Sequence, residues 1–260
     1  GVDAPVQLKK DLLRTAYLNG FTENLEKYEK EFGFKYEHQI NEGGELVFFW
    51  HNGLGPVKDE WSINFFVVKG KGGLVTFENE ELGLSFPFFL EDDEKSDALG
   101  DLKVVRVAFP KYLERKPYFK SAELFVSGKK HSLELAQNIN EIAFKTLEDR
   151  MLRELATSLL RLALKQATEH LVRKKNQDLG AILSIASAVT EKADTRNWQT
   201  LPYSIYYARI PLPEGENSIK LKTYSPTKRT EESVSFHFNV RKGETLFHLY
   251  HSLESFPLEN

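Results

Sequence analysis

One long helical pattern separates two groups of short strand-like runs, and this order limits the folds open to the chain. Between Ile139 and Lys175 apolar residues recur at every third or fourth position and form one broad stripe, which is typical of an amphipathic helix. Unbroken, such a helix would be roughly 50 Å long at 1.5 Å per residue. Aromatic and β-branched runs precede and follow it, separated by clusters of Gly, Pro and Asn. We therefore expect an α+β protein with helices inserted between strands.

Four strands are predicted on each side of this helix. They cover residues 45–50, 62–68, 102–109, 118–127, 203–210, 218–224, 233–240 and 245–250. In the seventh run Val234, Phe236, Phe238 and Val240 alternate with polar residues, so one face of that strand meets a core. The turn at 241–244 predicts a hairpin between the last two strands. We expect antiparallel, β-sandwich-like sheets, with two separate small sheets as the alternative.

Two more helical segments are predicted. From Val6 to Phe32 apolar residues recur at three- and four-residue steps, broken at Asn19-Gly20, which predicts a short helix pair. Residues 181–193 are built largely of Ala and Ser, which allow close approach, so they are expected to pair with the long helix as a hairpin.

The expected domain organisation follows from these segments. The helix pair occupies residues 1–36, and a β-rich domain occupies residues 37–260 with a helical insertion at 133–193. Residues 69–100, which include the acidic run 91–94, are expected to form a long loop.

Composition excludes several classes of function. The formal net charge of −3 gives no electrostatic reason for binding a polyanion, so no nucleic-acid partner is expected. The absence of cysteine excludes disulfides, thiol nucleophiles and thiolate metal sites. The longest near-apolar helical stretch, Leu179 to Val189, is far shorter than the roughly 20 residues that cross a bilayer. No cofactor is expected.

Several short motifs resemble those of an uncharacterised family of bacterial cell-envelope lipoproteins. They are Ala193-Asp-Thr-Arg-Asn-Trp198, Leu201-Pro202 and Ala208-Arg-Ile-Pro-Leu-Pro213, with Glu45-Leu-Val47, Asn52-Gly-Leu-Gly-Pro-Val-Lys58 and Val107-Ala-Phe-Pro110 as further pieces. The resemblance implies an exported protein facing the periplasm or anchored at the outer membrane, with membrane association only through a lipid anchor that is absent from this chain. It also implies that residues 6–32 are the end of a tetratricopeptide-like region. It implies no reaction, so partners are expected among envelope proteins.

Asp194, Arg196 and Trp198 are the first candidate site residues. A guanidinium can pair with a carboxylate and stack on an indole, so these residues would form a ligand clamp or, as we expect, a structural junction with Arg196 and Trp198 buried. Trp50, Asn52 and Lys58 lie in or beside the matched motifs. These are further candidates for binding or for the junction.

Two histidines form a weaker candidate. In the predicted hairpin His237 lies opposite His248 on one sheet face, where two imidazoles could share a metal. Zinc sites need three or four ligands, and no strong third ligand lies near this pair. A solvated polar face is therefore expected here, without a metal.

Pairs of consecutive aromatic residues place aromatic rings on both faces of several strands. Strand alternation sends one member of each pair to the opposite face. These pairs are Phe48 to Trp50, Phe65-Phe66, Phe88-Phe89 and Tyr206-Tyr207. The outward members form an apolar binding patch, unless helices cover them.

No catalytic constellation is recognisable, so the expected function is a non-catalytic envelope module for protein interaction or assembly. The alternative is an envelope hydrolase or a glycan- or ligand-binding protein. It would use the carboxylates Glu45, Asp59 or Glu60 near Trp50 and Trp61. Glycoside hydrolysis requires two carboxylates about 5 to 10 Å apart in one cleft.

Overall fold

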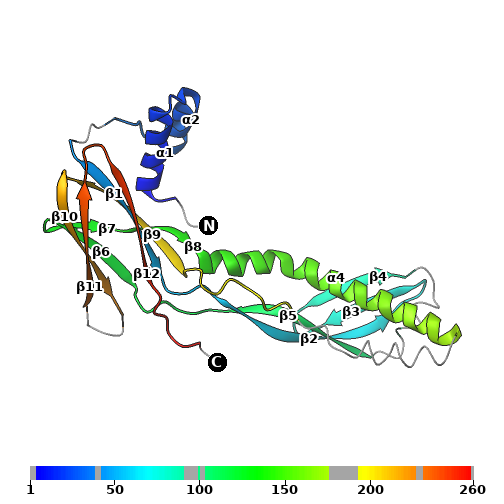
Figure 1. Ribbon diagram of the computed structural model, residues 1–260. Coiled ribbons are helices and arrows are strands. Elements are labelled where there is room, and N and C mark those ends of the chain that lie inside the picture. Colours follow the sequence, from blue (N-terminus) through cyan, green and yellow to red (C-terminus); the bar gives the residue numbers. More distant parts are fainter. Residues whose placement is uncertain are drawn as a thin grey trace. The chain divides into compact units, whose positions relative to one another are not determined.

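The computed structural model describes residues 4–38, 42–90, 99, 103–175, 193–226 and 231–258. Within these ranges three helices and twelve strands form a mixed α/β fold with three four-stranded, mostly antiparallel sheets (Figure 1). The chain divides into two compact units, each with its own core. Unit 1 comprises residues 1–57, 114–143 and 198–260, and unit 2 comprises residues 58–113 and 144–197. The predicted division at residues 36 and 37 stays a prediction.

Unit 1 contains two of the sheets. The first has the order β12-β1-β9-β8, and the second has the order β11-β10-β6-β7. Their strands are β1 (Gly44–Asn52), β6 (Ser121–Val126), β7 (Lys129–Ser132), β8 (Glu134–Asn138), β9 (Ser204–Leu212), β10 (Gly215–Tyr224), β11 (Glu231–Val240) and β12 (Thr245–Ser252). All neighbours are antiparallel except β1 and β12, which run parallel.

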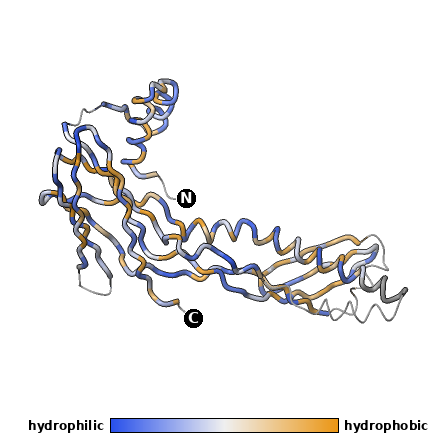
Figure 2. Tube along the Cα trace, in the orientation of Figure 1, coloured by the Kyte–Doolittle hydropathy of each residue, from blue (hydrophilic) through white to orange (hydrophobic). Residues whose placement is uncertain are grey.

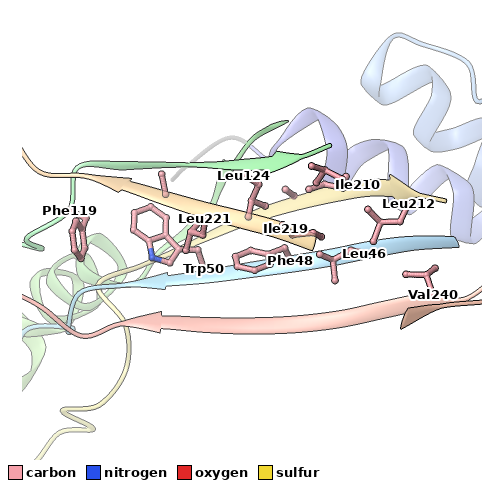
Figure 3. Packing of buried hydrophobic residues seen from close by; sticks show 13 residues of the cluster. Leu46, Phe48, Trp50, Phe119, Leu124, Ile210, Leu212, Ile219, Leu221 and Val240 are labelled. Atoms are coloured by element: carbon pink, nitrogen blue, oxygen red, sulfur yellow. The ribbon is translucent and has the colours of Figure 1, made fainter. Parts of the chain in front are cut away.

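The two sheets of unit 1 contribute side chains to one hydrophobic core. Phe48 and Trp50 of β1 are fully buried and share this core with Leu124 of β6 and Leu221 of β10 (Figure 3). The indole Nε1 of Trp50 donates a hydrogen bond of 2.9 Å to Ser252 Oγ, so its polar atom is satisfied inside the core. Even-numbered residues of β1 thus face inward, and odd-numbered residues face outward.

The predicted N-terminal helix pair is confirmed as α1 (Val6–Leu18) and α2 (Thr22–Phe32). On α1, Leu13 and Ala16 are buried, and polar side chains of the same helix reach the outward residues of the first sheet. The α2 helix has no buried residue and ends at Gly33. Gly33 has φ of +76°, a left-handed conformation that favours glycine at this helix end.

Unit 2 is a sheet covered on one face by a helix. Its sheet has the order β4-β3-β2-β5. The elements are β2 (Val57–Lys69), β3 (Leu74–Asn79), β4 (Leu84–Phe89), β5 (Val104–Leu113) and α4 (Ile139–Lys175), of which β2 and α4 begin within unit 1. Leu155, Leu159 and Ala163 of α4 are fully buried and share a core with Phe65 and Phe77. The apolar stripe predicted between residues 139 and 175 thus packs on this sheet.

The loop predicted at residues 69–100 is wrong for its described part, which contains β3 and β4. Val75 and Phe77 alternate with less buried residues, a strand pattern that the neighbouring glycines masked. Pro87 is tolerated because β4 is an edge strand among the described strands, with β3 as its neighbour on one side, so its missing N–H interrupts no second ladder there. All eight predicted strands are confirmed in position.

The predicted hairpin between the last two strands is also wrong. β11 pairs with β10 in one sheet, whereas β12 pairs with β1 in the other. The connection after Val240 carries the chain between the sheets and passes the start of β1 at Gly44. A Cβ atom at Gly44 would lie 2.6 Å from the carbonyl oxygen of Glu244, so only glycine fits there. The second helix predicted at 181–193 and the acidic run at 91–94 fall almost wholly outside the described residues.

Candidate functional site

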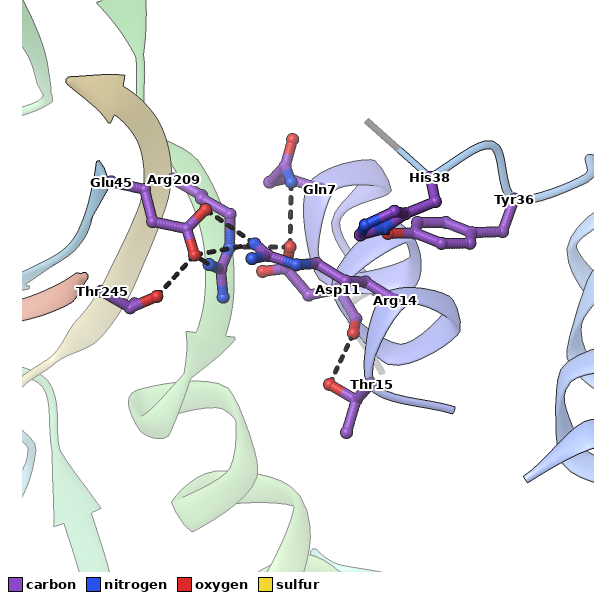
Figure 4. A network of polar contacts seen from close by, with 9 residues as sticks. All are labelled: Gln7, Asp11, Arg14, Thr15, Tyr36, His38, Glu45, Arg209 and Thr245. Atoms are coloured by element: carbon purple, nitrogen blue, oxygen red, sulfur yellow. Dashed lines mark hydrogen bonds and ion pairs between the residues drawn. The ribbon is translucent and has the colours of Figure 1, made fainter. Parts of the chain in front are cut away.

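A charged cavity of about 510 Å³ lies where α1 meets the outward face of the first sheet of unit 1. Its wall includes Asp11 and Arg14 from α1, Glu45 from β1, Arg209 from β9 and Tyr36 from the segment after α2. Figure 4 shows the guanidinium groups of Arg14 and Arg209 beside the carboxylate of Glu45, with Thr245 close to the same carboxylate. We call the residues Asp11, Arg14, Glu45 and Arg209 the ionic network.

The contacts within the ionic network are short. Arg14 Nη1 lies 2.7 and 2.6 Å from the two carboxylate oxygens of Glu45. Arg209 Nη1 lies 2.6 Å from Glu45 Oε1, and Thr245 Oγ1 donates to the same oxygen at 2.6 Å. Arg209 also reaches α1, because its Nε lies 2.8 Å from Asp11 Oδ1. Each charge in the network therefore has an opposite charge beside it.

Local structure explains why these side chains meet. Asp11 and Arg14 are three residues apart and so share one face of α1. In the first sheet Glu45 pairs with Thr245 on one side, and Val47 pairs with Arg209 on the other, so all of them point outward. The network thus joins α1 to two neighbouring strands, β1 through Glu45 and β9 through Arg209.

Electrostatics keep Glu45 ionised. Burial raises the pKa of its carboxyl group, but hydrogen bonds from Arg14, Thr245 and Arg209 outweigh burial and lower the pKa to about 2. A group with this pKa holds no proton to donate near neutral pH, which excludes it as a general acid. The network connects α1 to the first sheet and keeps Glu45 ionised.

The second candidate is the face of the unit 2 sheet opposite α4, on which apolar side chains are exposed. Phe66 and Phe89 are 56% and 78% exposed, and Val68 and Val104 are also exposed. Their neighbours in sequence, among them Phe65 and Phe88, belong to the core beneath α4 or pack against it, so the exposed residues lie on the opposite face. We call these four residues the open sheet face. The hydrophobic character of these strands is visible in Figure 2.

The junction prediction for Arg196 and Trp198 is wrong about burial. Arg196 pairs with Asp194 as expected, with Nε and Nη2 each 2.9 Å from a carboxylate oxygen, but its side chain is 91% exposed. Trp198 is 72% exposed, and its Nε1 donates to Thr200 Oγ1 at 2.5 Å. Only one residue separates Asp194 from Arg196, so this ion pair is local. Its formation buries neither side chain.

The other motif residues lie in different surroundings. Trp50 fills the core of unit 1, and Asn52 at the end of β1 is buried. Lys58 belongs to unit 2, where its N–H donates to Asn197 Oδ1 at 3.4 Å and its Nζ lies 5.8 Å from the ring centre of Tyr112. The structure therefore does not gather these three residues into one site.

The predicted pairing of His237 with His248 is wrong, since β11 and β12 belong to different sheets. His237 is exposed, whereas His248 faces the core of unit 1 between Phe48 and Phe236. A different pair, His51 and His251, lies side by side because β1 and β12 run parallel, with ring centres 4.5 Å apart. Burial and the neighbouring charge of His251 lower the pKa of His51. Predicting this histidine pair would have required knowing that β1 pairs with β12, which no sequence pattern indicated.

The carboxylates named for a hydrolase do not form a matched pair. Glu45 points outward from β1 while Trp50 points into the core. Asp59 and Glu60 are adjacent on β2 and so point to opposite faces. Asp59 lies 3.7 Å from Lys111 Nζ, and Glu60 accepts a hydrogen bond from the N–H of Ala193.

Comparisons with known proteins supply no further guide. No family model, curated protein or solved structure matches the chain significantly. Among the described residues, no group of three or more His, Asp or Glu side chains could hold a metal ion. No helix in these ranges is long and apolar enough to cross a membrane. Function must therefore be inferred from the surfaces described above.

Proposed function

We propose that this protein is a non-catalytic binding module of the bacterial cell envelope, and that the open sheet face of unit 2 docks onto an amphipathic helix of a partner protein. The observation that carries this proposal is the exposure of Phe66, Val68, Phe89 and Val104 on one sheet face. Exposed apolar side chains are costly in water, and on soluble proteins several of them on one face mark a binding surface.

The covered face of the same sheet indicates which kind of partner fits. There α4 packs with Leu155, Leu159 and Ala163 against aromatic and aliphatic residues of the strands. The open sheet face offers side chains of the same kinds, directed to the other side of the same strands. A second amphipathic helix, from the partner, would complete a helix–sheet–helix arrangement.

The envelope location has a separate basis. It is supported by the resemblance of Ala193-Asp-Thr-Arg-Asn-Trp198 and Ala208-Arg-Ile-Pro-Leu-Pro213 to envelope lipoproteins. The test is to label the full-length precursor in growing bacteria with a radioactive fatty acid and to fractionate the cells. A labelled, membrane-bound protein is expected, and an unlabelled protein in the cytosolic fraction would overturn the location.

Site-specific photo-crosslinking tests the docking proposal. A photoreactive phenylalanine analogue replaces Phe89 in the full chain, and a matched control carries it at Phe247, which is exposed on β12 of unit 1. We expect position 89, and not position 247, to crosslink to a partner peptide with apolar residues at three- and four-residue spacing. The additional substitution Val68→Ser is expected to reduce the crosslink without unfolding the protein.

Three other results would overturn the proposal. Crosslinking of position 89 to a second copy would make the face a self-association surface. Crosslinking to residues 176–192 of the same chain would show that the chain covers its own face. Equal crosslinking at positions 89 and 247 would show that the open sheet face contacts the partner no more specifically than another exposed surface does.

A further inference from the structure

The first sheet of unit 1 ends on one side at β12, and this edge strand is unprotected. Proteins usually protect an edge strand with a charged residue, a proline or an irregularity, because its free backbone groups would otherwise pair with another strand. The other described edge strands each carry such a feature, namely Pro87 in β4, Pro110 in β5, Lys130 in β7, a register shift in β8 and Glu232 in β11. Residues 245–252 contain no Lys, Arg, Asp, Glu or Pro, and they pair with β1 in one unbroken register.

The hydrogen bonds to β1 show which backbone groups of β12 point away from it. The carbonyl oxygen of Glu244 accepts from the N–H of Glu45 at 2.9 Å, and that of Ser252 accepts from the N–H of Gly53 at 2.7 Å. Alternate residues of a strand direct their backbone groups to the same side, so the even-numbered residues of β12 face β1. The odd-numbered residues direct their N–H and C=O groups to the open side, where no described strand pairs with β12. They are Thr245, Phe247, Leu249 and His251.

The side chains of these odd-numbered residues lie on the outward face of the sheet, and two of them are apolar and exposed. Phe247 is 71% exposed and Leu249 is 46% exposed. Leu246 and Tyr250, on the other face of β12, pack against the core of unit 1. A strand added beside β12 would therefore gain backbone hydrogen bonds and also cover exposed apolar side chains.

We infer that β12 pairs with β12 of a second copy of this chain, in antiparallel orientation across a twofold axis perpendicular to the sheet. The strand is complementary to itself in the register centred on residue 248. In this register Phe247 lies opposite Leu249 of the second copy, and Thr245 lies opposite His251 of the second copy. Each such pair exchanges two backbone hydrogen bonds, and no Lys, Arg, Asp or Glu of β12 opposes the contact. This surface belongs to unit 1 and is separate from the open sheet face of unit 2.

Sedimentation velocity of the full chain over a range of concentrations tests this pairing. We expect a monomer–dimer equilibrium with a Kd of about 100 µM, because one pair of strands covers less area than a standard protein interface. Phe247→Lys places a charged side chain on the edge, as protected edge strands do, and should raise this Kd about tenfold or more. The matched control Phe89→Lys changes a similarly exposed phenylalanine on another edge strand and should leave the Kd unchanged.

Amide hydrogen exchange of the unchanged protein, measured by nuclear magnetic resonance at low and high concentration, locates the contact. The amides of Phe247 and Leu249 should exchange more slowly as the dimer forms, whereas those of Leu246 and His248, which face β1, should keep their rates. A chain that stays monomeric at about ten times the expected Kd would overturn the inference and leave the edge to an extended segment of another protein. A dimer that Phe247→Lys leaves intact, or that Phe89→Lys disrupts, would also overturn it.

Discussion

Glu45 accepts hydrogen bonds from Arg14, Arg209 and Thr245, and these donors hold its pKa at about 2, below the ordinary value of 4.5. Because the folded pKa is depressed, the carboxylate stabilises the fold fully above about pH 4.5 and loses this contribution as the pH falls toward about 2. We predict that urea unfolding of the protein becomes easier across this window. In Glu45→Gln this component of the pH dependence should be missing.

The same residue should matter at neutral pH. Removing its charge takes away the carboxylate that pairs with Arg14 and leaves Arg209 with Asp11 alone, so Glu45→Gln should cost about 2 to 4 kcal/mol. Asp194→Asn is the control, since that carboxylate belongs to an exposed local pair. Equal midpoints of urea unfolding for Glu45→Gln and the unchanged protein would contradict a holding role for the network.

Phe77 and Phe89 lie on adjacent strands of one sheet but face opposite sides. Phe77 is fully buried beneath α4, so Phe77→Ala should cost about 3 to 5 kcal/mol. Phe89 is exposed, so Phe89→Ala should change stability by less than about 0.5 kcal/mol. Denaturation midpoints measure both. A large loss for Phe89→Ala would mean that this ring is covered in solution.

At the level of elements, local patterns predicted most strands and helices but not their partners. The alternation in Val234, Phe236 and Phe238 identified β11 correctly, because alternation depends only on which residues face a core. It carries no information on which strand lies alongside. The short turn after Val240 suggested a hairpin, yet both strands bury apolar side chains in the same core from opposite sheets.

Of the two candidate sites, the sequence predicted the exposed aromatic residues of the open sheet face but not the contacts of the ionic network. Strand alternation forced Phe66 or Phe65, and Phe88 or Phe89, onto an outer face, and the open sheet face confirms this local inference. Glu45 was recognised only as one carboxylate among several. Its partners Arg14 and Arg209 are 31 and 164 residues away along the chain, and no local pattern connects them.

Because the chain contains no cysteine, engineered disulfides can test the strand pairing directly. We predict that the double variant His51→Cys with His251→Cys oxidises readily to a crosslink, because the two positions are paired on parallel strands with ring centres 4.5 Å apart. His237→Cys with His248→Cys should stay reduced, because these positions belong to different sheets. Peptide mass mapping before and after reduction gives the result. If the 237/248 variant oxidised and the 51/251 variant stayed reduced, the result would support the predicted hairpin between β11 and β12.

At the scale of the whole molecule, the two units bury separate sets of side chains. Trp50 and Leu221 belong to the core of unit 1, whereas Phe77 and Leu159 belong to that of unit 2. A defect in one core therefore removes no buried contact from the other. This separation predicts that a large-to-small substitution should act within one unit only.

Amide hydrogen exchange can detect this separation segment by segment. In Phe77→Ala the cavity left beneath α4 lowers the free energy of opening of β2, β3 and β4, so their amides should exchange faster. The amides of β1, β9 and β10 should keep their rates, and the matched variant Leu221→Ala should reverse the pattern. Mass spectrometry of peptides from each strand provides the measurement. If either variant accelerated exchange equally throughout the chain, the two cores would unfold together as one cooperative structure. The two units would then differ in their contacts but would not be independently stable.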